Sequence, residues 1–543
     1  MSFEIRERDL LARVGRLETK SGIVETPALL PVINPTIQPI SPSTMRQEFG
    51  VNALITNAYI IKKHHESKAT EAGIHQLLDF KGVVMTDSGA YQILVYGDVE
   101  ATNREIIQFQ EQIDTDIATI LDIPTGWGIS QEYAKRTVET TWKRAKELSK
   151  IKTRDDILWV GPVQGGVYLN WLARSSKKMG KLPFKIHAIG SPTPVMEQYL
   201  FDTLVDMIMT AKINLPLERP VHLFGAGHPF MFSLAVALGC DLFDSAAYAL
   251  FAREDRYMTE TGTTRLSNLQ YFPCSCRVCS SANPADVKQR PKKKREEFLA
   301  RHNLHVSLAE IKRIKQAIKE GRLWEHVQMR THGHPALLRG LKRLSRYSAY
   351  LEVSTPVSKE AGLFFYDSND LIRPEILRHG TLLSERYDQP RDAQVLLLLP
   401  HSQAKPFHKS REHGRIMQEM SRQLKTKQSL FHVCTYEAPF GIVPSELDET
   451  YPLSQHEIAV PFDSETLAHV AREVQHFIAA RHYKKAVLLQ DRRTWNNTIA
   501  SACRRACKRR NIPLVVLSTV QPWNKPALSK LMNELQEIAR EET

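Results

Sequence analysis

The sequence predicts an α/β protein of more than one domain, whose larger part is a closed (β/α)8 barrel. Its 543 residues exceed the roughly 250 to 300 at which a single hydrophobic core stops growing. Between about residues 50 and 250, short apolar segments alternate with helical stretches, as in a parallel sheet. Nearly every apolar segment ends in a polar or glycine-rich cluster, which is where barrel strands build an active site.

Each predicted barrel strand is a short apolar run followed by turn-forming residues. In order, the runs are NALITNAYI, GVVMTDSG, IATILDIPTG, ILWVGPVQGG, KIHAIGSP, PVHLFGAGHP and GCDLFDSAA. The helix predicted after the N-cap Ser130 has apolar residues at helical spacing, at Tyr133, Val138, Trp142, Ala145 and Leu148. At least seven such units fit a closed TIM barrel better than an open sheet.

We expect the chain to divide into three parts. Residues 1–350 form the barrel domain, which includes a metal segment at 274–302, and residues 351–391 form a polar connector. Residues 392–543 form a smaller α/β domain with the apolar runs QVLLLLP, SLFHVCT, KAVLLQD and IPLVVLS.

The composition indicates a folded protein with a basic surface. Lys and Arg outnumber Asp and Glu by 73 to 60, a formal charge of +13, which favours a polyanionic partner and equally fits a solvated surface. No apolar run approaches the ~20 residues that cross a bilayer. The first residues, MSFEIRERDLLARVGRLET, lack the apolar stretch of a signal peptide. We therefore expect a cytoplasmic protein with no membrane partner.

Three of the seven cysteines lie within six positions, in Cys274-Ser-Cys276-Arg-Val-Cys279. This spacing favours a metal site over disulfides. His302 would complete a closed shell of three thiolates and one imidazole, the pattern of a structural rather than a catalytic zinc. His305 is a competing fourth ligand that the spacing leaves open.

Three aspartates each end an apolar segment: Asp87 in MTDSGAYQ, Asp122 in LDIPTG and Asp244 in LFDSAAYAL. A barrel would gather all three around one pocket. Any one of them alone could be a helix N-cap. Together they favour a shared site, because buried charges need a cationic or hydrogen-bond-donating ligand or a role in catalysis.

These motifs resemble, in order from the N-terminus to about residue 350, the tRNA-guanine transglycosylases, and specifically their archaeal branch. The stretches that carry the resemblance are MTDSGAYQ, LDIPTG, PVQGG, HAIGS, LFGAGHP, DLFDSAAYAL and CSCRVC with His302. The context NLHVSLAEIKRIKQAIKEGRLWE also matches this branch, and the resemblance assigns the fourth zinc ligand to His302.

The resemblance implies roles for the site residues. Asp244 would attack C1′ of the target nucleotide and Asp87 would handle protons, although which of the two is the nucleophile stays open in the sequence. Asp122 would accept hydrogen bonds from a guanine-like base. The remaining base-binding residues would be Ser88, Tyr91, Gln164, Gly165, Gly190 and Ser191.

The resemblance also implies the substrates. Guanine 15 in the D-loop of tRNA would be exchanged for 7-cyano-7-deazaguanine (preQ0), the precursor of archaeosine, with one structural Zn2+ and no other cofactor. The target base would leave the RNA stack to be reached. Members of the family are commonly homodimers. We find no PUA domain in the sequence, so a separate PUA-domain protein could take part.

The C-terminal part resembles the central domain of archaeosine synthase, in PHSQAKPFHKSREH and APFGIVPSELDETYPLSQHE. That family has Cys where this chain has His401 and Tyr where it has Phe407, whereas Lys405 is kept. One alternative function is therefore a synthase-like attack of Lys405 on the nitrile. We favour a domain without this activity, because the motif has lost its cysteine while the barrel acids are complete. A second alternative is a non-catalytic tRNA-binding subunit, against which the presence of Asp244 argues.

Overall fold

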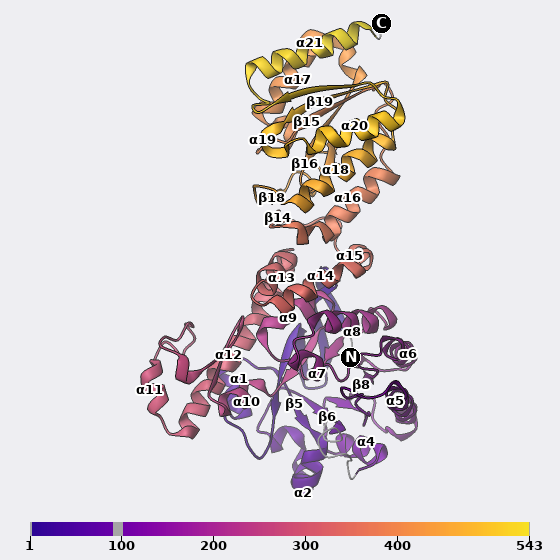
Figure 1. Ribbon diagram of the computed structural model, residues 1–543. Helices are drawn as coiled ribbons and strands as arrows, with labels where there is room; N and C mark the ends of the chain where they lie inside the picture. The colour runs from indigo at the N-terminus through magenta and orange to yellow at the C-terminus, as the bar shows by residue number, and fades with distance from the viewer. Residues whose placement is uncertain (1–2, 91–100, 542–543) are drawn as a thin grey trace. The chain divides into compact units, whose positions relative to one another are not determined.

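The computed structural model describes residues 3–90 and 101–541. The chain forms two compact units, Met1–Tyr347 and Ser348–Thr543. The first contains a closed barrel surrounded by helices, and the second contains an open sheet covered by helices on both faces (Figure 1).

The barrel is closed by eight parallel strands, in the order β10-β11-β4-β5-β6-β7-β8-β9, which confirms the predicted fold class. The strands are β4 (Ala28–Ile33), β5 (Ala53–Asn57), β6 (Val83–Asp87), β7 (Ile117–Thr119), β8 (Leu158–Val163), β9 (Ile186–Ile189), β10 (Val221–Leu223) and β11 (Leu242–Ser245). The helices that follow them are α1 (Pro42–Phe49), α2 (Ala58–Leu77), α4 (Asn103–Gln112), α5 (Gln131–Ile151), α6 (Leu169–Gly180), α7 (Thr193–Glu197), α8 (Phe201–Asn214), α9 (Pro229–Ala237) and α10 (Ala247–Arg253).

The seven predicted runs form β5 to β11, and β4 is the eighth strand that the sequence pattern missed. Pro27 precedes β4 and Pro31 lies within it, and proline argues against a central strand because it cannot donate to the ladder. The strand nevertheless pairs with β5 on one side and with β11 on the other, where Leu30 lies opposite Asp244. The α5 prediction is confirmed, since the side chain of Ser130 caps the helix by accepting from the Tyr133 N–H.

A buried ion pair joins the barrel to an antiparallel sheet near the N-terminus. This sheet consists of β1 (Phe3–Asp9), β2 (Ala12–Thr19) and β3 (Gly22–Thr26). Arg13 on β2 donates to both carboxylate oxygens of Asp241, at 2.7 and 2.8 Å, and both side chains are almost fully buried. The Asp241 carboxylate also accepts from the Val221 N–H at 2.8 Å, so it fixes the start of β10.

The rest of the first unit follows the barrel. Its elements are β12 (Arg256–Thr259), β13 (Gly262–Arg265), η1 (Leu266–Asn268), α11 (Pro284–Gln289), α12 (Lys292–Lys319), α13 (Leu323–Thr331), α14 (Pro335–Arg343) and η2 (Leu344–Tyr347). The long helix α12 packs against α10 and β12, and α13 and α14 pack against α9 and α8.

The second unit is built on a five-stranded sheet of order β17-β16-β15-β19-β20. The four predicted runs form its parallel strands, and β17 pairs antiparallel with β16. Its strands are β14 (Leu363–Phe365), β15 (Val395–Pro400), β16 (Phe431–Glu437), β17 (Gly441–Pro444), β18 (His456–Ile458), β19 (Lys485–Asp491) and β20 (Leu514–Thr519). Its helices are α15 (Ser348–Ser354), η3 (Ser368–Ile372), α16 (Pro374–Glu385), η4 (Phe407–Lys409), α17 (Arg411–Leu424), η5 (Lys425–Leu430), α18 (Ser464–Ala479), α19 (Arg492–Trp495), α20 (Thr498–Arg510) and α21 (Lys525–Glu541).

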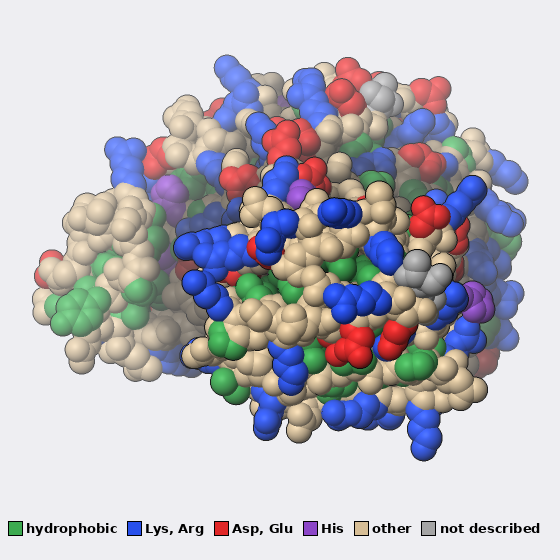
Figure 2. Space-filling view, turned by 90° about the horizontal axis from the view of Figure 1, so that it is seen from above, with side chains coloured by type: hydrophobic (Ala, Val, Ile, Leu, Met, Phe, Trp, Pro, Cys, Tyr) green, Lys and Arg blue, Asp and Glu red, His purple; other side chains and the backbone are tan. Residues whose placement is uncertain are grey.

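A hydrophobic core covers each face of the five-stranded sheet, and a third cluster of buried residues lies around β14 and β17. Side chains from α17 and α21 pack on one face, and side chains from α18 and α20 pack on the other. The stretch expected as a connector contributes α15, β14, η3 and α16, and β14 pairs with β18. Lys and Arg side chains are spread over the face of this unit that Figure 2 shows. Among the described residues, no helix combines the length and the apolarity needed to span a bilayer.

We predict that Arg13→Met lowers the free energy of unfolding by about 3 to 5 kcal/mol, because it leaves the Asp241 carboxylate buried without its partner. Urea unfolding of the two proteins measures the difference. Arg16→Met on the same strand is the matched control, since no ion pair is recorded for the half-buried Arg16. Equal losses in the two variants would contradict a stabilising role for the ion pair.

Candidate active site and metal centre

The three predicted aspartates meet at the carboxyl ends of the barrel strands. Asp87 is the last residue of β6, Asp122 follows β7, and Asp244 is the second-to-last residue of β11. The charges of Asp122 and Asp244 both act on Asp87. The barrel therefore brings together carboxylates that are far apart in the sequence.

Asp87 is the carboxyl group whose proton affinity the site changes most. Burial, together with the negative charges of Asp122 and Asp244, raises its pKa from 3.8 to about 7. Backbone hydrogen bonds from Gly89 and Ser88 oppose this shift. The Asn57 amide and the Gly89 N–H lie 3.3 and 3.4 Å from Oδ2. Near neutral pH, Asp87 can therefore both donate and accept a proton.

Asp122 is held by a buried amide network. Burial raises its pKa to about 6, while a 2.5 Å hydrogen bond from Nε2 of Gln164 works in the opposite direction. Oε1 of Gln164 accepts from the Thr125 N–H at 3.0 Å and from the Ser191 hydroxyl at 3.2 Å. Because its oxygen is occupied in this way, Gln164 can turn only its NH2 group toward Asp122, and the carboxylate is fixed in place.

Asp244 receives both of its recorded hydrogen bonds on one oxygen. Nε2 of His222 lies 2.8 Å from Oδ1, and the Gly225 N–H donates to the same atom at 2.9 Å. No described residue donates to Oδ2. The carboxylate is thus oriented by β10 and the turn after it, with its second oxygen available to a ligand.

Small residues near these acids allow close approach of their neighbours. A Cβ on Gly190 would lie 2.1 Å from Nε2 of Gln164, and one on Gly165 would lie 2.5 Å from the backbone N of Leu172. Ser88 is fully buried, and its hydroxyl has no hydrogen-bond partner among the described residues. Ser191 joins the network through its hydroxyl, which also accepts from the Thr125 N–H at 2.9 Å. The predicted stacking residue Tyr91 lies outside the described residues.

Sequence reasoning missed three residues of this site: His222, Asn57 and Thr125. The run PVHLFGAGHP contains His222, but alternation along a short strand does not show that its ring faces the next strand's aspartate. Asn57 and Thr125 are ordinary cap and turn residues in the sequence, and their contacts arise only when the barrel closes.

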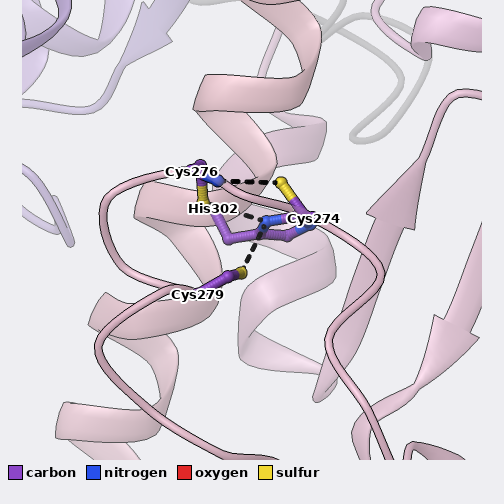
Figure 3. Close-up of side chains that lie close together, drawn as sticks. All are labelled: Cys274, Cys276, Cys279 and His302. Atoms are coloured by element: carbon purple, nitrogen blue, oxygen red, sulfur yellow. Dashed lines mark hydrogen bonds between the residues drawn. The ribbon is translucent and has the colours of Figure 1, made fainter.

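A separate cluster of the first unit can bind one metal ion. The ligand atoms of Cys274, Cys276, Cys279 and His302 all lie within 4.8 Å of one another, and the four side chains point toward a common centre (Figure 3). Nδ1 of His302 lies 3.2 Å from Sγ of Cys279 and 3.6 Å from Sγ of Cys276. The competing His305 instead packs against the ring of Phe49, at 4.4 Å between ring centroids.

The surroundings of His302 suit a metal ligand. Nε2 lies 2.8 Å from the carbonyl oxygen of Met258, which sets Nε2 as the protonated nitrogen and leaves Nδ1 to face the sulfurs. The ring of Tyr257 stacks on the imidazole at 3.6 Å between centroids. A four-ligand shell of this kind has no open position for a substrate.

Comparison with known proteins agrees with this arrangement. Residues 9–336 match the family model described as queuine tRNA-ribosyltransferase. The chain belongs to this family. Residues 376–535 match a family described as a domain of unknown function (DUF5591).

Three curated relatives of the queuine tRNA-ribosyltransferase family are named tRNA-guanine(15) transglycosylase. The protein from Methanocaldococcus jannaschii is 44% identical over 86% of this chain and 70% of its own length. The protein from Methanosarcina mazei is 44% identical over 83% of this chain and 86% of its own. The protein from Sulfolobus acidocaldarius is 39% identical over 90% of this chain and 95% of its own length.

Lys405 of the second unit lies after β15, in the part of the chain that matches the domain of unknown function. Burial lowers the pKa of its ammonium group, and the charges of Glu437 and Glu457 oppose that shift. The ammonium nitrogen lies 5.8 Å from the centroid of the Phe407 ring. The ring of His401 lies 5.8 Å, between centroids, from the rings of Phe462 and Trp495.

We predict that Asp87→Asn makes the protein more stable than the wild type at pH 8 but not at pH 5. Between pH 4 and 7 the folded wild type binds more protons than the unfolded chain, because folding raises the pKa of the Asp87 carboxyl group from 3.8 to about 7. Its stability relative to Asp87→Asn therefore falls across this window, by about 4 kcal/mol at most.

Chemical denaturation at several pH values measures this difference. Asp79→Asn is the matched control, because Asp79 is exposed and its left-handed backbone suits asparagine equally well. A stability difference between wild type and Asp87→Asn that is the same at pH 5 and pH 8 would rule out the raised pKa.

Proposed function

We propose that this protein exchanges guanine 15 of tRNA for 7-cyano-7-deazaguanine through a ribosyl-aspartate intermediate. The observation that carries the proposal is the unequal surroundings of Asp244 and Asp87 in one pocket. Membership in the queuine tRNA-ribosyltransferase family and the names of the curated relatives support the reaction class and the position.

Asp244 is the better nucleophile of the two. Its Oδ1 is held by His222 and Gly225, and its Oδ2 receives no hydrogen bond from a described residue. Attack of Oδ2 on C1′ forms the ester bond, and the electron pair of the glycosidic bond departs with guanine. A covalent intermediate of this kind divides one difficult displacement into two easier ones.

Asp87 serves as the acid and then as the base. With a pKa of about 7, it carries a proton in a large fraction of molecules at neutral pH and can give it to the departing guanine. The resulting carboxylate then takes a proton from the incoming base, whose ring nitrogen attacks C1′ and displaces Asp244. A group with a pKa near the working pH is best suited to both transfers.

Asp122 and its neighbours recognise the base. With a pKa of about 6, Asp122 is mostly ionised at neutral pH and accepts from the ring N–H and the exocyclic amino group of a guanine-like base. The unpartnered hydroxyl of Ser88 supplies one further polar contact. The backbone of Gly165 and Gly190 can approach the base closely, because neither carries a side chain.

The metal of the cysteine cluster is zinc in this proposal. Three thiolates and one imidazole are a typical zinc shell, and a closed shell supports structure without taking part in the exchange. The ion would tie the segment 274–279 to α12 through His302.

We predict that Asp244→Asn abolishes incorporation of labelled guanine and labelled 7-cyano-7-deazaguanine into unmodified tRNA, by roughly 10⁴-fold or more. Asp87→Asn lowers the rate by about 10² to 10⁴-fold, the usual contribution of acid–base catalysis. Sequencing of the product checks that the label lies at position 15, and an unchanged nitrile excludes synthase-like chemistry at Lys405.

Mass spectrometry of the trapped intermediate distinguishes the two aspartates. The ribosyl ester is expected on the peptide that contains Asp244, and the peptide that contains Asp87 should be unmodified. An ester on Asp87 would reverse the assigned roles, and a wild-type protein that exchanges neither base would refute the function.

We predict one zinc ion per chain, and its loss in Cys279→Ser. That variant should melt more than about 5 °C below the wild type, because metal binding contributes directly to folding. Elemental analysis and thermal unfolding measure both effects. Cys240→Ser is the control, since Cys240 is equally buried but lies outside the cluster. Retention of zinc by Cys279→Ser would show that the cluster is not the binding site.

A further inference from the structure

A cavity with a basic lining lies at the amino edge of the sheet in the second unit. Its volume is about 380 Å³, and its charged lining residues are Arg391, Arg481, Lys484 and Arg510, with His482 beside them. They come from the stretch before β15, the turn between α18 and β19, and the end of α20. Among the described residues, no carboxylate lines this cavity. It lies at the opposite edge of the sheet from Lys405, which follows the carboxyl end of β15.

Arg481 lines this cavity and is a buried cation with no ion pair to a described carboxylate. It is only 6% exposed. Its Nη2 donates to the carbonyl oxygens of Leu383 and Tyr387, at 2.6 and 3.2 Å, and its guanidinium lies 3.8 Å from the centroid of the Phe477 ring. Its Nε has no hydrogen-bond partner, and no described carboxylate lies within ion-pair distance. Burial lowers the pKa of this guanidinium, and nearby groups, Asp388 among them, oppose that shift.

A buried cation of this kind is costly unless an anion compensates it. Asp388 and Asp392, the nearest acids in the chain before β15, are both exposed and do not line the cavity. The missing negative charge can therefore come from a ligand. Arginine side chains suit phosphate oxygens in particular, because their planar donor groups match that geometry.

Gln394 adds an acceptor to this set of donors. Its side-chain oxygen is buried at the cavity and has no hydrogen-bond partner among the described residues. After a turn of the amide toward the cavity, a ribose 2′-hydroxyl could donate to this oxygen, and the 2′-hydroxyl distinguishes RNA from DNA. The cavity thus offers donors for a phosphate and an acceptor for the adjoining sugar.

The basic surface continues along α20. Its exposed face carries cations and its buried face carries Ala and Cys, and the helix contains no acidic residue. The exposed residues are Arg504, Arg505, Lys508, Arg509 and Arg510. Cations in the last turn also stabilise the helix dipole. That effect falls off within one turn, so it accounts neither for Arg504 and Arg505 nor for the cations of the cavity.

We propose that the amino-edge cavity and the exposed face of α20 bind the sugar-phosphate backbone of tRNA, outside the barrel. This inference rests on the proposed function for the identity of the RNA. The surface provides charge and sugar contacts, which position an RNA without reading its sequence. The second unit is then a docking module for the substrate.

The test neutralises three exposed cations of this surface in the full-length chain, as Arg391→Gln, Lys508→Gln and Arg509→Gln combined. The matched control combines Arg415→Gln, Lys525→Gln and Lys530→Gln, which lie on α17 and α21 and are also exposed. The control is needed because basic side chains are common on this unit (Figure 2). Filter binding of unmodified tRNA at several salt concentrations gives the affinities.

We expect the first triple variant to bind tRNA about 10-fold or more weakly than the wild type. The plot of log K against log salt should become shallower, its slope smaller in magnitude by about 2 to 3. The reason is that each phosphate contact contributes roughly 0.7 to 0.9 to the magnitude of that slope. The control triple variant should change affinity less than about 2-fold. Equal binding by the two triple variants, or an unchanged salt slope, overturns the proposal.

Two further measurements separate this proposal from folding effects and from the proposed function. The single variant Arg391→Gln leaves α20 intact and should show about one third of the slope change that the triple variant shows. In the exchange reaction, the first triple variant should raise KM and leave kcat unchanged. A wild type that binds tRNA through this surface but exchanges no base would refute only the proposed function. Exchange with an unaffected KM would refute only the docking surface.

Discussion

Repulsion among buried carboxylates at one end of the barrel is the constraint on which the site depends. Parallel strands place their carboxyl ends at the same end of the barrel, so Asp87, Asp122 and Asp244 lie near one another. They cannot all be ionised there without cost. The surroundings separate them: the Asn57 and Gly89 hydrogen bonds to Asp87 are long, whereas Asp244 receives two short ones from β10 and its following turn. One carboxyl group thereby has a pKa near neutrality, and another is held by short hydrogen bonds.

Such a site requires a rigid support, because its members come from separate strands. The ring is closed where β4 pairs with β11, beside Asp244 itself. At the opposite edge, the ion pair between Arg13 and Asp241 fixes the start of β10, the strand that carries His222. Within the pocket, the absence of a side chain at Gly190 leaves room for Gln164 to hold Asp122. Small displacements of any of these would change the distances on which the chemistry depends.

The chain divides its tasks between its two units. The first holds the acids and the cluster of three cysteines and His302, which could bind one metal ion and joins a short cysteine-rich segment to α12. The second has a complete sheet with a core on each face, so it is a folded module rather than an extension of the barrel. Its basic amino edge and its Lys405 edge lie at opposite ends of the same strands, and they can therefore evolve independently.

The sequence alone determined the barrel, the three acids and the thiol ligands, because strand periodicity, strand-end polarity and Cys spacing are local properties. It could not reveal β4, in which prolines hide the strand, or choose between His302 and His305, which lie three residues apart on one helix. The partners of Asp244 and the raised pKa of Asp87 were likewise decided only by the tertiary structure. Hydrogen bonds and charge repulsion depend on distances between strands, and only the closed barrel sets those distances.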